Sequence, residues 1–148
     1  MKTYFYIIAI LIGFSSCSSG KEEKLEPVDF SIDQYPMEFV LTEFSTMMVD
    51  SQVTGEDLPY REKYIFREDL TFTKSRTENG ETLQLEGEYS RVSMSDENYF
   101  KLNYDLTNDL IESCSSDDTE HLIIDSPMKI RGTANACDYP TKTYERVK

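Results

Sequence analysis

Apolar and polar side chains alternate along most of the chain from Met37 onward, and turn residues interrupt this alternation every eight to twelve positions. The pattern indicates short antiparallel β-strands with one buried face, because successive side chains of a strand point to opposite sides. Strands are predicted at residues 37–46, 60–66, 70–77, 82–92, 98–105, 109–114, 119–125, 128–134 and 141–147. No helix is predicted with the same force, although the irregular stretch 49–58 has room for a turn or a short helix.

One hairpin can be predicted residue by residue. Asn79-Gly80 is a dipeptide favoured where both turn residues need a positive φ, so Glu78 should face Glu81. The pairs on one face are then Leu70 with Tyr89, Phe72 with Gly87, Lys74 with Leu85, and Arg76 with Leu83. The pairs on the other face are all polar: Thr71 with Glu88, Thr73 with Glu86, Ser75 with Gln84, and Thr77 with Thr82. A slip of one residue would mix the two faces, so the pattern supports this register.

The next strand continues the same wall. With a tight turn at Ser95-Asp96, the predicted pairs are Arg91 with Phe100, Tyr89 with Leu102, and Gly87 with Tyr104. Three neighbouring strands then present one largely apolar inner wall, and Phe72 can cover the gap that Gly87 leaves. Such a meander can close into a barrel or fold over as a sandwich. We expect an all-β, up-and-down antiparallel meander of eight to nine strands that closes into a small barrel, since closure removes exposed edges.

The N-terminal segment has a different composition. Lys2 precedes an uncharged stretch over residues 4–14, and small residues follow it up to Cys17. A positive start, a short apolar run and small residues are typical of a secretory signal; the alternative is a short transmembrane anchor. Because the small residues end in cysteine, the segment resembles a bacterial lipoprotein signal, with Phe14 where leucine is usual. This resemblance implies that Cys17 is acylated, with palmitate as an expected chain, and becomes the mature N-terminus.

The expected destination is the outer membrane. Ser18 follows the cysteine, so the aspartate that retains lipoproteins at an inner membrane is absent. Lys21-Glu22-Glu23 resembles an acidic tract that sends some lipoproteins to the cell surface, but an ordinary solvated linker fits it equally well. The predicted organisation is a signal peptide over 1–16, an acylated cysteine with a flexible tether over 17–34, and a barrel domain over 35–148.

Cysteine count and charge limit the remaining chemistry. Acylation of Cys17 leaves Cys114 and Cys137, an even pair in an oxidising compartment, so we predict a disulfide between them. Two buried free thiols are the alternative, and zinc is disfavoured because the pair and the single His121 are one ligand short. The formal net charge of −13 disfavours nucleic acid and anionic lipid surfaces and favours cationic partners, unless it serves solubility alone.

Two stretches of the barrel region carry a family resemblance. Residues 64–73, Tyr-Ile-Phe-Arg-Glu-Asp-Leu-Thr-Phe-Thr, resemble the Y-x-F-x-x-D-G-T-F stretch of bacterial lipocalin-like domain lipoproteins. Cys-Asp-Tyr-Pro at 137–140 and Thr-Tyr-Glu-Arg at 143–146 resemble the closing segment of the same group. Leu70 stands where that group has glycine, and the chain has no Trp to open its first strand, where Met37 or Phe39 takes its place. The resemblance implies a small β-barrel that can bind an apolar molecule.

Candidate ligand-binding residues follow from the inner wall. Inward tyrosine hydroxyls need a hydrogen-bond partner, and inward cations should lie at the barrel mouths with their stems on apolar surface. The candidates are Tyr64, Phe72, Lys74, Arg76, Tyr89, Arg91 and Tyr104. They predict a cavity with a cationic rim for a fatty acid or similar amphiphile, or else a filled core without a ligand.

Catalysis is not expected. His121 should face solvent or cap a strand edge, and no serine lies in a Gly-x-Ser-x-Gly context. The acidic pairs Asp105 with Asp109 and Asp117-Asp118 with Glu120 lack the ligand spacing of a calcium loop, and no cofactor motif is present. Two hypotheses remain open: a carrier of a small apolar or amphiphilic ligand, and an acidic module that binds a cationic protein through its surface.

Overall fold

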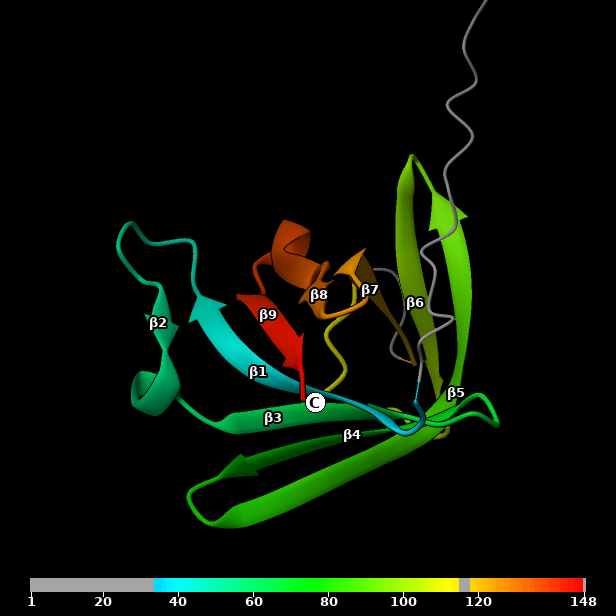
Figure 1. Ribbon diagram of the computed structural model, residues 1–148. Helices are drawn as coiled ribbons and strands as arrows, with labels where there is room; N and C mark the ends of the chain where they lie inside the picture. Colours follow the sequence, from blue (N-terminus) through cyan, green and yellow to red (C-terminus); the bar gives the residue numbers. More distant parts are fainter. Residues whose placement is uncertain (1–33, 115–117, 148) are drawn as a thin grey trace, which may run out of the picture.

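The computed structural model describes residues 34–114 and 118–147, and within them the chain forms a closed antiparallel barrel of eight strands with one short extra strand (Figure 1). The predicted fold class is therefore confirmed. The predicted signal segment, Cys17 and most of the predicted tether lie outside the described residues. No helix of the described part is long and apolar enough to cross a membrane.

The strands follow one another around the barrel in chain order. Their bounds are β1 Met37–Ser45, β2 Val53–Thr54, β3 Arg61–Phe66, β4 Thr71–Glu78, β5 Glu81–Met94, β6 Glu97–Tyr104, β7 Thr119–Ser126, β8 Lys129–Gly132 and β9 Thr141–Arg146. Two short 3₁₀ helices, η1 Gly55–Asp57 and η2 Ala134–Cys137, lie between strands. β1 pairs with β9 and closes the barrel, which leaves β2 as a short addition against β1.

The predicted register of the β4–β5 and β5–β6 hairpins is confirmed at every strand pair. Glu78 faces Glu81, Phe72 faces Gly87, and Tyr89 faces Leu102. The turn residues Asn79, Gly80, Ser95 and Asp96 all have φ between 48° and 84°, as two-residue hairpin turns require. Polar–apolar alternation and two turns therefore determine three strands of the wall.

Gly87 is the point where β5 passes from one hairpin to the next. The strand pairs with β4 through Glu88 and with β6 from Gly87 onward, and Figure 1 shows it as the long, curved strand shared by both hairpins. A Cβ on Gly87 would lie 2.1 Å from the carbonyl oxygen of Asn103 and 2.9 Å from a ring carbon of Phe72. Phe72 thus covers the glycine as predicted, and the site has no room for a methyl group.

Leu70 also adopts a glycine-like backbone, with φ 65° in the β3–β4 turn. Its amide donates to the carbonyl of Arg67, and its side chain is exposed. The left-handed conformation costs a leucine about 1 kcal/mol more than it costs glycine. The turn therefore has a backbone that glycine would adopt more easily, although leucine occupies the position.

Two sequence-based expectations are wrong. Residues 109–114 form no strand, because the amides of Leu110 and Ile111 both donate to Asn108 and turn the chain across the end of the barrel. Leu110 and Ile111 are adjacent and both buried, which a half-buried strand would not allow. Leu83, expected on the buried face, is 47% exposed because β6 ends opposite Gly87, so this part of β5 has β4 as its one neighbouring strand. The apolar residues within 109–114 resemble a strand in sequence, but they are buried because this segment covers the barrel end.

The other differences are small. β8 is shorter than the predicted strand at 128–134, since η2 begins at Ala134. The irregular stretch 49–58 holds β2 and η1, as its turn-like composition allowed.

The apolar half of the interior is built from aromatic rings. Phe66 stacks on Phe100 with ring centroids 4.5 Å apart and meets Tyr89 edge-to-face at 4.9 Å. Phe39 and Phe72 also contact Phe66 and are wholly buried. These rings fill the interior near the start of β1, so the polar interior lies towards its other end.

We predict that Gly87→Ala destabilises the barrel, because the new methyl would collide with the Asn103 carbonyl and the Phe72 ring. The expected loss is about 2 kcal/mol or more in the free energy of unfolding, measured by urea titration. Gly132→Ala is the matched control, since the nearest atom to its added Cβ is 3.9 Å away. Equal stability of the two variants would contradict this account of the β5 crossover.

Candidate functional site: a charged cluster inside the barrel

Four strands carry a charged side chain at an inward position. Glu62 on β3 and Glu120 on β7 lie on the same face of their strands as the buried apolar residues that follow them. Lys74 on β4 and Lys142 on β9 are inward in the same way and are fully buried. An isolated buried charge is very costly, so these groups must be paired.

Lys74 and Glu120 form the first pair. The Lys74 ammonium lies 3.2 Å from both carboxylate oxygens of Glu120. The hydroxyl of Tyr64 donates to the same carboxylate at 3.1 Å, and the hydroxyl of Tyr104 donates to it as well. Lys74 also donates to the carbonyl of Leu110 at 2.7 Å. Glu120 thus accepts from three inward donors, two of which are tyrosines that sequence reasoning had placed on the inner wall.

Glu62 and Glu112 hold the other two cations. Lys142 lies 3.1 Å from Glu62 and also pairs with Glu112. Arg76 bonds Glu62 through its Nε and lies 3.1 Å from Glu112 through Nη2. The hydroxyl of Tyr144 donates to Glu62 at 2.6 Å. Arg76 stacks over Tyr60 at 4.1 Å and is the member nearest to solvent, with 15% of its side chain exposed.

Glu112 reaches this cluster from a connection and not from a strand. It lies in residues 105–114, here called the cap segment, which crosses the barrel end and supplies the buried side chains of Leu110 and Ile111. A disulfide joins Cys114 at the end of this segment to Cys137 in η2. The predicted disulfide is confirmed. The bond fixes the cap segment beside the neighbouring connection.

The surroundings shift the pKa values of the two strand carboxylates, Glu62 and Glu120, in opposite directions. Burial alone would raise the pKa of Glu62, but Lys74, Lys142, Arg76 and the Tyr144 hydroxyl lower that pKa to about 2. Burial raises the pKa of Glu120 in spite of the opposing charge of Lys74. Burial likewise raises the pKa of the tyrosines Tyr64, Tyr104 and Tyr144, so their hydroxyls stay protonated and act as donors.

No protein-family model, curated protein or solved structure matches the chain. The function must therefore be inferred from its residues and their geometry.

The structure brings together most of the predicted ligand-binding residues. Tyr64, Phe72, Lys74, Tyr89 and Tyr104 are buried in the interior, and Arg76 is mostly buried at its edge. Arg91 is the exception: it is exposed near the start of β1, where it donates to the Tyr35 hydroxyl at 3.3 Å and lies 5.7 Å from the Phe100 ring. Whether any of these residues binds a ligand stays a prediction.

The expected position of the cations is wrong for Lys74. Its ammonium was expected at a barrel mouth, but it is fully buried because Glu120 and the Leu110 carbonyl satisfy it inside. Every buried side-chain nitrogen or oxygen in the described part of the chain has a hydrogen-bond partner. The polar groups of the interior thus form hydrogen bonds and ion pairs with one another.

The carboxylates and Lys142 were missed by sequence reasoning. Glu120 alternates with Leu122 and Ile124, and Glu62 alternates with Tyr64 and Phe66, so strand parity alone would have found both. Lys142 could have been found from Tyr144 in the same way. Glu112 carries no such signal, because it belongs to no strand.

His121 has its side chain on the outer face of β7. It is opposite Lys101 and meets the Tyr99 ring edge-to-face, with partial burial. Burial and Lys101 lower its pKa. No group of three His, Cys, Asp or Glu side chains within 34–114 and 118–147 is placed to hold a metal ion.

We predict that Glu62→Gln lowers stability at neutral pH by about 3 kcal/mol, since Lys142 and Arg76 would then share Glu112 alone. The folded-state pKa of Glu62 lies below its unfolded value. Its contribution is therefore fully present above about pH 4.5 and is lost as the pH falls towards 2.

Urea unfolding between pH 7 and pH 2 measures this contribution. The wild-type free energy should fall more steeply with acid than that of Glu62→Gln. The control is Glu88→Gln, an exposed carboxylate on the outer face of β5 that should leave the curve within about 0.5 kcal/mol of wild type. Parallel curves for wild type and Glu62→Gln would show that Glu62 is not held ionised by the cluster.

Proposed function

We propose that this protein is an acylated envelope lipoprotein whose barrel has a filled core and binds a basic protein through its outer surface. Of the two functions that the sequence left open, this one fits the interior better. The cations offered to an amphiphile are already paired with Glu62, Glu112 and Glu120, and the cap segment covers the barrel end where they lie. The lipocalin-like ancestry suggested by residues 64–73 is kept as part of the proposal, because a closed eight-stranded barrel is compatible with it.

Charge is distributed unevenly between the two ends of the barrel, and this observation carries the proposal. We call the end with the cap segment and the β1–β2, β2–β3, β4–β5 and β8–β9 connections the capped end. Its exposed acidic residues are Asp50, Glu56, Asp57, Glu78, Glu81, Asp105, Asp109, Asp118 and Asp138. Among the described residues of these connections and adjoining strand ends, the basic side chains that are not buried are the exposed Arg61 and the partly exposed Arg76. Arg76 is already paired with Glu62 and Glu112.

The opposite end, called the base, is nearly balanced in charge. It comprises the β3–β4, β5–β6 and β7–β8 turns with the start of β1 and the end of β9. Its exposed acidic residues are Glu68, Asp69, Asp96, Glu97, Asp125 and Glu145. Its basic residues are the exposed Arg91 and the partly exposed Arg67, Lys129, Arg131 and Arg146. A cationic partner would therefore be attracted to the capped end.

The chain direction agrees with this assignment. β1 begins at the base, so a tether that joins Cys17 to β1 would leave from there. If Cys17 is acylated, the capped end points away from the membrane, where a protein can reach it.

We predict that the full mature chain, purified in detergent, retains basic proteins in preference to acidic proteins of similar size. Retention should be strong at low salt and fade at high salt, because exposed charges are screened beyond about 10 Å at 0.1 M ionic strength. Surface plasmon resonance against a panel of purified basic and acidic proteins measures both effects.

Native mass spectrometry on the same preparation addresses the carrier hypothesis. The filled core predicts the mass of the acylated chain with nothing further bound. A co-purifying amphiphile, or equal retention of acidic and basic proteins, would contradict the proposed function.

A further inference from the structure

The β1–β2 loop, residues 46–52, exposes three consecutive apolar side chains at the capped end. Met47, Met48 and Val49 are 75%, 74% and 92% exposed. Single exposed apolar residues are common on soluble proteins, but a contiguous group of them marks a contact site more often than chance. Methionine in particular suits a contact surface, because its flexible thioether adapts to a partner's shape.

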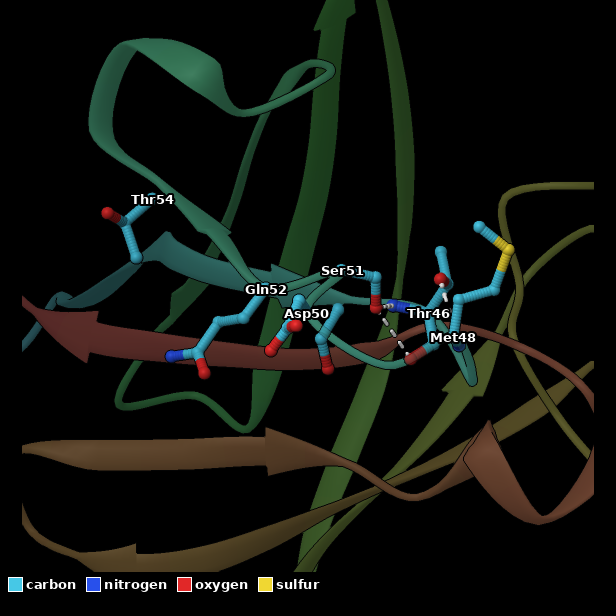
Figure 2. Close-up of a pocket in the computed structure, with 7 residues that line it drawn as sticks. Thr46, Met48, Asp50, Ser51, Gln52 and Thr54 are labelled. Atoms are coloured by element: carbon cyan, nitrogen blue, oxygen red, sulfur yellow. Dashed lines mark hydrogen bonds between the residues drawn. The ribbon is translucent and has the colours of Figure 1, made fainter.

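The loop is held in one shape by its own polar groups. The Ser51 hydroxyl accepts from the amide of Thr46 at 2.9 Å and donates to the Thr46 carbonyl at 2.9 Å, as the dashed lines between these residues in Figure 2 show. The Thr46 hydroxyl accepts from the amide of Met48 at 3.4 Å. Gln52 donates to Glu43 on β1, which fastens the far side of the loop. The apolar tip is therefore presented in a formed loop, and binding would order little additional chain.

A polar pocket of about 600 Å³ lies beside this tip. Its lining includes Asp50, Ser51 and Gln52 together with Met48 (Figure 2). The carboxylate of Asp50 and the amide oxygen of Gln52 accept hydrogen bonds, which suits the ammonium of a lysine or the guanidinium of an arginine. Apolar and acidic surface thus adjoin within one loop.

We infer that residues 46–52 are the main contact for the partner, and that the partner presents a segment in which basic and apolar side chains alternate. The inference rests on the proposed function and names its site. Met47, Met48 and Val49 pack against the apolar side chains of that segment, while Asp50 and the acidic capped end pair with its cations. A lipid surface fits less well, because the capped end repels anionic lipids and lies opposite the end where β1 begins.

The probe is a synthetic peptide of alternating arginine and leucine, titrated into the full mature chain by isothermal calorimetry. Two related peptides carry serine in place of leucine or glutamate in place of arginine. We expect the arginine–leucine peptide to bind more tightly than either. The triple variant Met47→Ser, Met48→Ser, Val49→Ser should bind the arginine–leucine peptide about tenfold more weakly. Asp50→Asn should also bind this peptide more weakly, and the salt dependence of binding should be smaller.

The matched control is the double variant Met94→Ser, Met128→Ser. It removes two exposed apolar side chains, 44% and 41% exposed, from turns at the base, and should leave binding within about twofold of wild type. All these substitutions are at exposed positions, and circular dichroism with thermal unfolding verifies that each variant folds.

The outcomes separate the site from the function. Equal binding by wild type and the triple variant would overturn the loop assignment and leave the acidic surface as the binding site. Preference for the glutamate–leucine peptide would overturn the proposed function itself. Loop-dependent binding to phosphatidylcholine vesicles, with no binding of any peptide, would identify a lipid contact and overturn this inference.

Discussion

The structure depends on the mutual pairing of cations and carboxylates inside a small barrel. Lys74, Arg76 and Lys142 enter the interior with Glu62, Glu112 and Glu120, and each charge lies within hydrogen-bond distance of an opposite one. Because the cost of desolvating an ion is several kcal/mol, removing any member leaves its buried partners with one opposite charge fewer, and in the Lys74–Glu120 pair with none. The pairing also recruits the cap segment, since Glu112 and the Leu110 carbonyl complete it. The same contacts thus hold the cap segment over the barrel end and neutralise the charges inside.

Much of the fold could be predicted because two hairpin turns set the register of three neighbouring strands, β4, β5 and β6. Once Asn79-Gly80 and Ser95-Asp96 place their strands, the polar face of β4 and β5 admits a single register, and the structure has it. Barrel closure followed from the absence of elements to cover a sheet edge. The N-terminal predictions, with acylation of Cys17 among them, concern residues outside the described part.

The interior was harder to predict, because inward cations were expected at the barrel mouths and no inward carboxylate was expected to meet them. Glu62 and Glu120 obey the alternation of their strands, but a carboxylate at an inward position makes sense only once its cation is known. That cation comes from a different strand. The cap segment has no periodic pattern, so the sequence does not indicate that it contributes to the cluster. Leu110 and Ile111 likewise resemble strand residues until the chain is seen to cross the barrel end. Pairings between elements distant in sequence are therefore where prediction from alternation stops.

Because the polar groups of the interior pair with one another, the outer surface is where we propose that a partner binds. The barrel then serves as a rigid support that separates a charge-balanced base from an acidic capped end and presents the 46–52 loop from a fixed strand. Polar groups that would hold a ligand head group in an open barrel here hold the cap segment instead. This exchange is the reason why we propose recognition at the outer surface of the barrel and not in its interior.

The most direct test of the central claim is a double-mutant cycle on Lys74→Met and Glu120→Gln, with free energies of unfolding from urea titration. Each single change strands a buried partner, so each should cost about 3 kcal/mol, and the double variant should cost about 2 kcal/mol less than their sum. Costs that add within about 0.5 kcal/mol would show that the two side chains do not stabilise each other and would contradict a barrel held by internal ion pairs.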